Sequence, residues 1–302
     1  MAISANLKDT EIAQGALEAF VDGFAPVTRF STNFSSEFAT LKGDTVQVPL
    51  YSATGAAEDY DASKGFNPDA YSTQSADATT VSVTIDKRVT AQLELTVKQL
   101  NEHELDIGLM MKQKAHQLAK SCFQYVLGVV TNANYGAAAL TSTAANFDAA
   151  DLTTISTALN ANEVPKMGRF ALFDCDYMDE LTDDTRISDG SAFGSYEAIR
   201  DGRVPRVKGF DLMESFFIPS NSENLVGVAG RAEGIAVAQR ILDRSGLDIN
   251  GVSFVQSHPE SGLAFTYRRF FDDTLDKLII ALEWYGGRSV GIASAMERIV
   301  SA

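Results

Sequence analysis

The chain has 302 residues, of which 45% are hydrophobic and 22% charged, and its formal net charge at pH 7 is -15. This size is sufficient for a real core and for two subdomains. The 40 acidic side chains outnumber the 25 basic ones and would repel a phosphate backbone, which argues against sequence-independent nucleic-acid binding. No stretch approaches the roughly 20 apolar residues of a membrane-spanning helix, and the first residues lack the pattern of a secretion signal. We therefore expect a soluble protein made in a cytoplasm.

Residues 1–43 form a candidate N-terminal arm. Pro26 and the serines and threonines around it argue against one continuous helix there. Aromatic side chains recur through the second half of the arm, at Phe20, Phe24, Phe30, Phe34 and Phe38. Two interpretations are open. The arm either lies along another surface or packs as an extension on its own domain.

Residues 44–95 show the period of two that is typical of strands. Apolar side chains occupy alternate positions in two runs, at Val46, Val48 and Leu50 and then at Val81, Val83, Ile85, Val89, Ala91, Leu93 and Leu95. The polar segment 52–77 separates the runs. The pattern predicts a long two-stranded hairpin with a large polar tip. Two strands alone bury too little surface to be stable in water, so the hairpin needs something to lean on.

Residues 96–146 carry the longest helical pattern. Thr96 and Gln99 have the spacing of a capping box, and apolar side chains follow every three, four or seven residues from Val97 to Val129. We predict one helix from Thr96 to about Ala133, roughly 55 Å long at 1.5 Å per residue. A linker rich in Gly, Ala and Thr extends from there to Asn146.

Residues 147–245 have a mixed α/β pattern, and residues 246–302 return to strands. Asp148 is a candidate cap for a helix with Leu152, Ile155 and Leu159 on one face. The predicted elements that follow are a strand at 169–174, a helix at 177–181, strands at 210–214 and 225–229, and a helix from Ala232 to about Leu242. The last part predicts strands at 263–271 and 274–284 around a turn at Asp272–Asp273, and a final strand from Val290 to Ala295.

The sequence offers no recognisable catalytic centre. The three histidines, His103, His116 and His258, complete no zinc motif, and there is no nucleophile elbow, dinucleotide fingerprint or P-loop lysine. Cys122 and Cys175 exclude a disulfide framework and suit buried apolar positions. We therefore predict no enzyme activity, no cofactor and no metal site.

The order of these segments resembles the major capsid proteins of tailed bacteriophages, whose coat-protein fold is shared with encapsulins and the herpesvirus capsid floor. Local likenesses are Val207–Ser215 and Trp284-Tyr285-Gly286. The resemblance implies an α+β fold with an N-terminal arm, an extended loop over 44–95 and the spine helix of a peripheral domain with its linker over 96–146. It further implies an α/β axial domain over 147–245 and a returning β ribbon of the peripheral domain over 246–302.

The same resemblance implies a structural function. Copies would form pentamers and hexamers that close into an icosahedral phage head around double-stranded DNA, in a virion assembled in the host cytoplasm and without a membrane. Some relatives crosslink a hairpin lysine to an asparagine of a neighbour, but no asparagine follows Asn250, so we expect no such crosslink. The short arm leaves no room for an assembly domain. We therefore expect a separate scaffolding protein, with a portal and decoration proteins as further partners.

Inter-subunit contacts are expected at charged side chains. Asp59, Asp61 and Lys64 at the hairpin tip would meet Arg268, Arg269 or Arg288 of a neighbour. The basic loop residues Arg200, Arg203 and Arg206 lack stacking aromatics, so pairing with acidic groups of another subunit is favoured over nucleic-acid binding.

Two other functions remain open. An encapsulin-type shell would have the same fold and hold enzyme cargo, but the long arm and the large polar hairpin favour the virus. A soluble α/β enzyme with an unrecognised site is the second alternative, and the scarcity of histidine argues against it.

Overall fold

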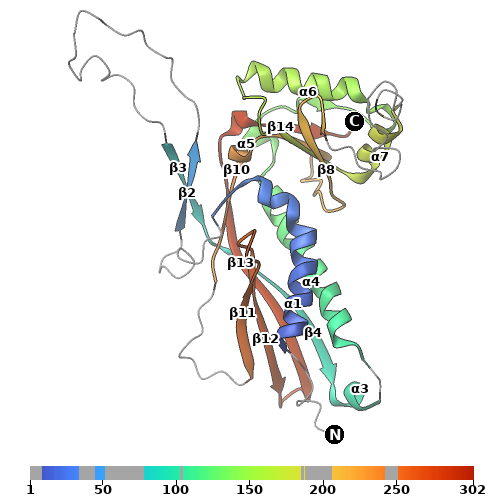
Figure 1. The fold of residues 1–302 in the computed structure, drawn as a ribbon, viewed down its shortest axis with the longest axis vertical. Coiled ribbons are helices and arrows are strands. Elements are labelled where there is room, and N and C mark those ends of the chain that lie inside the picture. Colours follow the sequence, from blue (N-terminus) through green and yellow to red (C-terminus); the bar gives the residue numbers. More distant parts are fainter. Residues whose placement is uncertain are drawn as a thin grey trace, which may run out of the picture.

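The computed structural model describes residues 9–33, 45–51, 78–102, 105–184, 187, 206–241 and 251–302. The described chain has two α+β lobes and a hairpin that projects from their side (Figure 1). The long lobe contains one six-stranded sheet, and the end lobe contains a second. One cluster of buried apolar side chains fills the long lobe and continues onto β6, β9 and β14 of the end lobe, and a second cluster lies within the end lobe.

The described residues form helices, short 3-10 turns and strands. The helices are α1 (Asp9–Phe24), α3 (Val97–Glu102), α4 (Ile107–Leu127), α5 (Asn132–Tyr135), α6 (Ala149–Ala161) and α7 (Cys175–Asp183). The short 3-10 turns are η2 (Ala25–Arg29), η5 (Ala144–Asn146), η6 (Ala232–Gly234) and η7 (Ala293–Ala295). The strands are β1 (Ser31–Asn33), β2 (Thr45–Tyr51), β3 (Ala78–Thr84), β4 (Lys87–Thr96), β5 (Leu140–Thr141), β6 (Phe170–Phe173), β7 (Arg206–Val207), β8 (Phe210–Glu214), β9 (Leu225–Gly230), β10 (Ile235–Gln239), β11 (Val252–Ser257), β12 (Ala264–Asp272), β13 (Lys277–Val290) and β14 (Met296–Val300).

Strand β13 is the centre of the sheet in the long lobe. The strand order is β1-β10-β13-β12-β11, and β4 also pairs with β13. Gly286 is paired with Gln239 of β10 and with Lys87 of β4, so β13 has neighbours on both edges at this point. Because side chains alternate along a strand, Ile280, Leu282 and Trp284 share one face, and all three are buried.

Helices α1 and α4 lie side by side over this sheet (Figure 1). The rings of Phe20 and Phe24 stack with centroids 5.4 Å apart, and Phe24 meets Trp284 edge-on at 6.1 Å. Phe30 is also buried in this core. This part of the arm therefore packs on its own chain, whereas Phe34 and Phe38 lie outside the described residues. Helix α1 ends at Phe24, and Pro26 lies in the 3-10 turn that follows, as the interruption predicted from this proline requires.

The single 55 Å helix predicted from Thr96 is wrong. Thr96 and Gln99 do form a capping box, but α3 ends at Glu102 and α4 begins only at Ile107. Asp106 starts the second helix because its side chain accepts a hydrogen bond from the Leu109 N–H at 3.0 Å. Helix α4 has 21 residues and ends before Gly128. It is therefore about 32 Å long.

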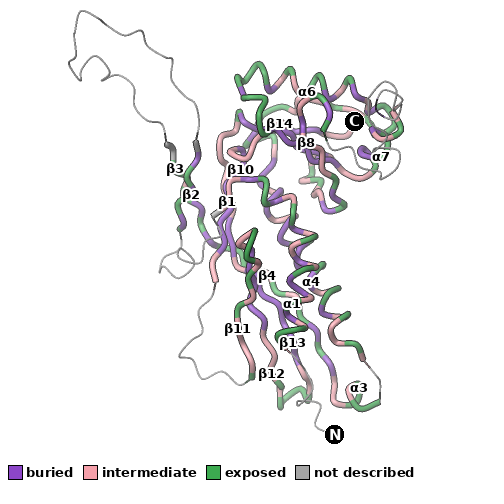
Figure 2. The backbone as a smooth tube through the Cα atoms, viewed as in Figure 1, coloured by how far each residue is buried: buried purple, intermediate pink, exposed green. Residues whose placement is uncertain are grey.

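The predicted hairpin is present, but its second apolar run forms two strands, β3 and β4, that pair with different partners. Strands β2 and β3 pair antiparallel from Thr45–Thr84 to Tyr51–Ala78. Two residues later the chain continues as β4, which pairs with β13 instead of β2. Alternation alone does not reveal this change of partner, because both strands keep the same period. Figure 2 shows alternating buried and exposed residues along the two hairpin strands.

The root of the hairpin leans on the chain's own body. The alternate apolar side chains of β2 and β3 form a small buried cluster with Ala236 and Ala238 of β10. The expectation that the hairpin needs a supporting surface is thus met within one chain for the described strands. Residues 52–77, which carry the predicted tip, lie outside the described residues.

The end lobe confirms most of the predicted α/β elements. Its strand order is β5-β14-β9-β6-β8-β7. Asp148 and Asp151 form a capping box at the start of α6, and the predicted apolar face of that helix is buried. All four residues of β6 are buried, in agreement with the predicted short core strand.

Two predicted elements between the lobes are wrong. Residues 235–239 form strand β10 instead of a helix, and all five are buried. A strand buried on both faces has no alternation, and periodicity cannot distinguish it from a buried helix. The predicted final strand at 290–295 is replaced by the end of β13 and the turn η7. The last strand is β14, which joins the sheet of the end lobe, whereas β10 joins the sheet of the long lobe.

Turns η6 and η7 lie side by side where the chain passes between the two lobes. The Gly291 N–H donates to the Gly234 carbonyl at 3.0 Å, and the Ile292 N–H donates to the Glu233 carbonyl at 2.8 Å. Gly291 lies so close to this backbone that an added Cβ would be 2.1 Å from the Glu233 carbonyl oxygen. The connection is therefore close-packed and requires a glycine at position 291.

We predict that Gly291→Ala destabilises the chain by about 2–3 kcal/mol, because backbone must shift to admit the methyl group. Gly15→Ala is the matched control. It lies inside α1, where the added Cβ meets only the flexible end of Lys112. Alanine is the better helix former by about 0.5–1 kcal/mol, so this variant should be neutral or stabilising. Urea unfolding of both variants measures the difference, and equal midpoints would contradict the packing described.

Candidate functional site

The described residues contain no group of three or more His, Cys, Asp or Glu side chains that could hold a metal ion. No helix among them has the length and apolar character needed to cross a membrane.

The two thiols are poorly suited to nucleophilic chemistry. Burial raises the pKa of the Cys122 thiol well above its ordinary value. The pKa of Cys175 is raised to about 11 by burial and by nearby carboxylates, of which Glu214 has the largest effect. A reactive cysteine needs a lowered pKa, so both groups are protonated at neutral pH. His258 contributes to a local turn, with its Nδ1 3.1 Å from the Ser261 hydroxyl oxygen.

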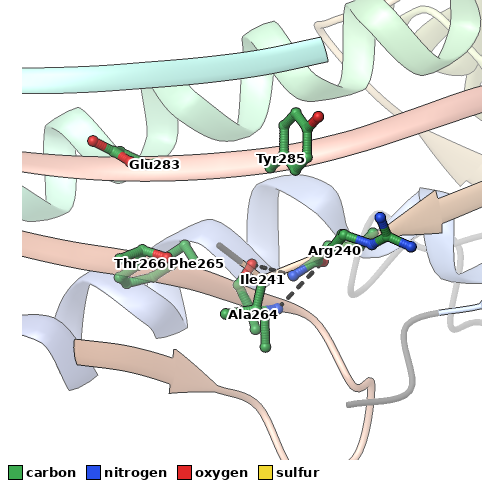
Figure 3. Close-up of a pocket in the computed structure, with 8 residues that line it drawn as sticks. Arg240, Ile241, Ala264, Phe265, Thr266, Glu283 and Tyr285 are labelled. Atoms are coloured by element: carbon green, nitrogen blue, oxygen red, sulfur yellow. Dashed lines mark hydrogen bonds between the residues drawn. The ribbon is translucent and has the colours of Figure 1, made fainter. Parts of the chain in front are cut away.

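A small cavity lies where β10 ends and β12 begins, beside β13 (Figure 3). Its volume of about 10 Å³ has room for roughly one water molecule. The Gln239 side chain joins the strands around it. Its Oε1 accepts hydrogen bonds from Trp284 Nε1 at 3.3 Å and from the Ala264 N–H at 3.4 Å, while its Nε2 donates to the Ala264 carbonyl. This cavity is a small gap between hydrogen-bonded strands of the sheet, and it is too small for a substrate.

A larger hollow of about 780 Å³ lies between the two lobes. Its lining comes from the end of α1, η2, α4, α7, β8 and the residues after β8. Phe216 lines it and is 75% exposed, and the neighbouring Phe217 packs against His116 with ring centroids 5.0 Å apart. This volume falls in the range of sites that accept a small molecule or a short peptide.

Glu283 is the most deeply buried charged group near the predicted contact residues. Its side chain is 3% exposed, and it forms ion pairs with Arg88 at 2.9 Å and Arg268 at 3.1 Å. The three residues come from β13, β4 and β12. The carboxylate therefore links three neighbouring strands, and Arg268 has a partner within its own chain.

Arg269 ties the start of α1 to the sheet. It forms an ion pair with Asp9 at 2.9 Å, and the Tyr267 hydroxyl donates to the same carboxylate at 2.9 Å. Both side chains of the pair are largely buried. The contact supports the packing of the arm on its own chain.

Arg288 lies over the ring of Tyr125, with 4.5 Å between its guanidinium carbon and the ring centroid. Burial lowers the pKa of this arginine. Arg206 forms an exposed pair with Asp211 at 3.7 Å. Asp59, Asp61, Lys64, Arg200 and Arg203 lie outside the described residues. A role for any predicted residue in contacts between subunits therefore stays a prediction.

Sequence reasoning missed the acidic partners Asp9 and Glu283 and the aromatic partner Tyr125. A signal was present for Glu283, because it is the only charged residue in the apolar run 278–285. A lone carboxylate in such a run needs a cationic partner when it is buried. No comparable signal marks Asp9 or Tyr125, which depend on how the helices pack.

No protein-family model and no curated protein sequence matches the chain. Several solved structures are similar to it. A structure of Mycobacterium phage Che8 matches with a TM-score of 0.58 and 15% identity, covering 89% of both chains. The capsid of cyanophage P-SCSP1u matches with a TM-score of 0.56 and 15% identity, covering 90% of this chain and 86% of the other. The virus-like particle from Pyrococcus furiosus matches with a TM-score of 0.52 and 11% identity, covering 96% of both.

The chain therefore has the α+β coat-protein fold of phage capsids. The match extends over about nine-tenths of each chain, so it includes both lobes. The fold that the order of segments predicted is confirmed.

We predict that Glu283→Gln lowers the free energy of unfolding by about 2–3 kcal/mol. The substitution leaves two arginines without their buried counter-charge, which costs more than the loss of an exposed pair. Arg88→Ala is the control, because the Arg88 side chain is 47% exposed and Glu283 keeps Arg268. That variant should lose less than about 1 kcal/mol. Urea titration distinguishes them, and equal losses would show that Glu283 does not link the strands.

Proposed function

We propose that this chain is a major capsid protein that self-assembles as pentamers and hexamers into an icosahedral phage head. The observation that carries the proposal is a capsid fold shared over about 90% of both chains. The head would enclose double-stranded DNA without sequence-specific contact, and the net charge of -15 suits a wall that does not adhere to it.

The projecting hairpin supports assembly on physical grounds. Strands β2 and β3 pair only with each other among the described strands, and their cluster with β10 is small. A two-stranded hairpin is marginal alone, so a neighbouring subunit would add stability to the part beyond the root. Copies that each give and receive one such contact form rings. Many weak contacts then act together in a closed shell.

We propose a structural role without catalysis or a cofactor. The raised pKa values of both thiols support this role, because neither thiol is a ready nucleophile. The partners we propose are other copies of the chain, a separate scaffolding protein, a portal and decoration proteins. The acidic surface suits a basic segment of the scaffolding protein. The protein would be located in the virion after assembly in the host cytoplasm.

The second candidate function is an encapsulin-type shell that holds enzyme cargo. The hollow beside Phe216 is large enough for a short peptide, which is the kind of segment by which cargo could dock. The contents of purified particles distinguish the two functions, since nuclease-protected DNA supports a phage head and a co-purifying enzyme supports the alternative.

We predict that the full chain, expressed with its scaffolding partner where one is required, forms hollow particles, tubes or rings in negative-stain electron microscopy. The matched control replaces residues 52–77 by Asn-Gly. Tyr51 pairs with Ala78, so a two-residue turn can close the strands without changing the root. This variant should fold and remain unassembled. A parent chain that stays monomeric with the partner present would contradict the proposal.

Contacts at the hairpin tip are proposed for Asp59, Asp61 and Lys64, against arginines of a neighbour. Asp59→Asn combined with Asp61→Asn should lower the yield of closed particles, although each exposed pair contributes less than about 1 kcal/mol. Asp179→Asn is a control at an exposed position of α7. Particle counts at matched protein concentration measure the effect. Equal yields from all three proteins would exclude these two carboxylates as assembly contacts.

A further inference from the structure

We infer that the hydrogen bond between Tyr125 and Asp86 fixes the direction in which the β2–β3 hairpin leaves the long lobe. Tyr125 belongs to α4, and Asp86 belongs to the link between β3 and β4. Both are positioning residues. Their importance for assembly rests on the proposed function, whereas their effect on the direction of the hairpin does not.

The link is the one place where β3 is joined covalently to the body strand β4. Strand β3 ends at Thr84 and β4 begins at Lys87, so only Ile85 and Asp86 lie between them. Changes in the backbone angles of a few such residues are enough to swing an attached element. The orientation of the hairpin therefore depends on what holds these two residues, together with the apolar cluster that its root forms with β10.

Two hydrogen bonds hold the link, and the first residue of β4 makes a further contact beside it. The Tyr125 hydroxyl donates to Asp86 Oδ1 at 2.6 Å, and the Tyr285 hydroxyl donates to the Ile85 carbonyl at 3.1 Å. The Lys87 ammonium lies 5.8 Å from the centroid of the Tyr125 ring. The link is thus fastened to α4 and to β13, two elements of the long-lobe core.

Tyr125 is itself held in place. Its ring meets Trp284 edge-on at 6.2 Å and is covered by the Arg288 guanidinium. Burial, and then the hydrogen bond with Asp86, raise the pKa of the Tyr125 hydroxyl, so it stays protonated and available as a donor. A short hydrogen bond from a hydroxyl to a carboxylate belongs to the stronger class of protein hydrogen bonds.

Close backbone packing adds a second constraint at the root. A Cβ added to Gly287 would be 2.0 Å from the Thr84 carbonyl oxygen. The end of β3 therefore rests directly on β13. Thr84 directly precedes Ile85 and Asp86, so this backbone contact and the contacts of the link hold adjacent residues.

A small rotation at the link produces a large displacement at the far end of the hairpin strands. Strand β2 has seven residues and is about 23 Å long at 3.3 Å per residue. A rotation of roughly ten degrees at the link would move its far end by about 4 Å, which is comparable to the spacing of two packed atoms. A hairpin that must meet a neighbouring subunit therefore needs a fixed direction.

The direct test is a distance measurement by pulsed electron resonance between two spin labels. Thr80→Cys on β3 and Gln117→Cys on α4 place the labels at exposed positions of the hairpin and the body. Cys175→Ser removes the partly buried native thiol, and the fully buried Cys122 remains inaccessible. The labelled full-length chain is diluted into excess unlabelled chain, so that only pairs within one molecule contribute.

Tyr125→Phe and Asp86→Ala are the test variants. The first removes the donor and keeps the aromatic ring, and the second removes the acceptor at an exposed position. Tyr177→Phe is the matched control, because it removes a tyrosine hydroxyl that donates to the Ser142 carbonyl at 2.8 Å in the end lobe. Thermal unfolding of each variant verifies that it is folded.

We expect a narrow distance distribution for the parent and for Tyr177→Phe, and a broadened or shifted one for both test variants. Loss of this hydrogen bond should raise the population of displaced hairpins roughly tenfold or more. The reason is that the free energy of a hydrogen bond to a charged acceptor is large enough to change a population by that factor. Folded test variants with the narrow distribution of the parent would overturn the inference. Failure of the parent to assemble would contradict the proposed function and leave this comparison valid.

Discussion

The pairing of β13 on both of its edges is the constraint on which the rest of the structure depends. This strand of 14 residues pairs with β12, β4 and β10, and it then leads through η7 into the sheet of the end lobe. Its two faces have different roles. One face buries Trp284 beneath the helices, where truncation of such a side chain would cost about 3–5 kcal/mol. The other face carries Glu283, which holds arginines of the two flanking strands.

The two lobes and the hairpin differ in how firmly they are held. Each lobe has a six-stranded sheet, one buried apolar cluster runs from the long lobe onto strands of the end lobe, and hydrogen-bonded turns join the lobes beside it. The hairpin has two strands and is held by the link of Ile85 and Asp86 and by its small apolar cluster with β10. Elements with few buried contacts open most readily, so the hairpin depends on the contacts of Ile85 and Asp86 for a fixed direction more than the lobes do.

Much of the fold could be predicted from the sequence because many elements have one solvent-facing side. The alternation at Val46 and Val48 and the capped face of α6 indicated the right element types for this reason. The prediction failed where burial removes the pattern, as in β10, and where a local cap outweighs a periodic run, as at Asp106. The change of partner between β3 and β4 leaves no trace in the period, because both strands bury alternate residues.

The candidate surfaces were less predictable than the fold. Arg268 and Arg269 stand out in the sequence as charges on a strand, but their partners Glu283 and Asp9 belong to other elements and are brought close only by packing. Pairs of this kind depend on strand register and on the docking of α1. The aromatic pattern of the arm likewise suited two interpretations until the buried position of Phe20 and Phe24 decided between them for that part of the arm.

A reconstruction of assembled particles by electron cryomicroscopy tests the central claim most directly. The account predicts pentamers and hexamers in which the lobes of each subunit keep the fold described and each β2–β3 hairpin lies against a neighbouring subunit. A particle in which every hairpin contacts only its own chain would contradict it, and so would a homogeneous population of monomers with the scaffolding partner present.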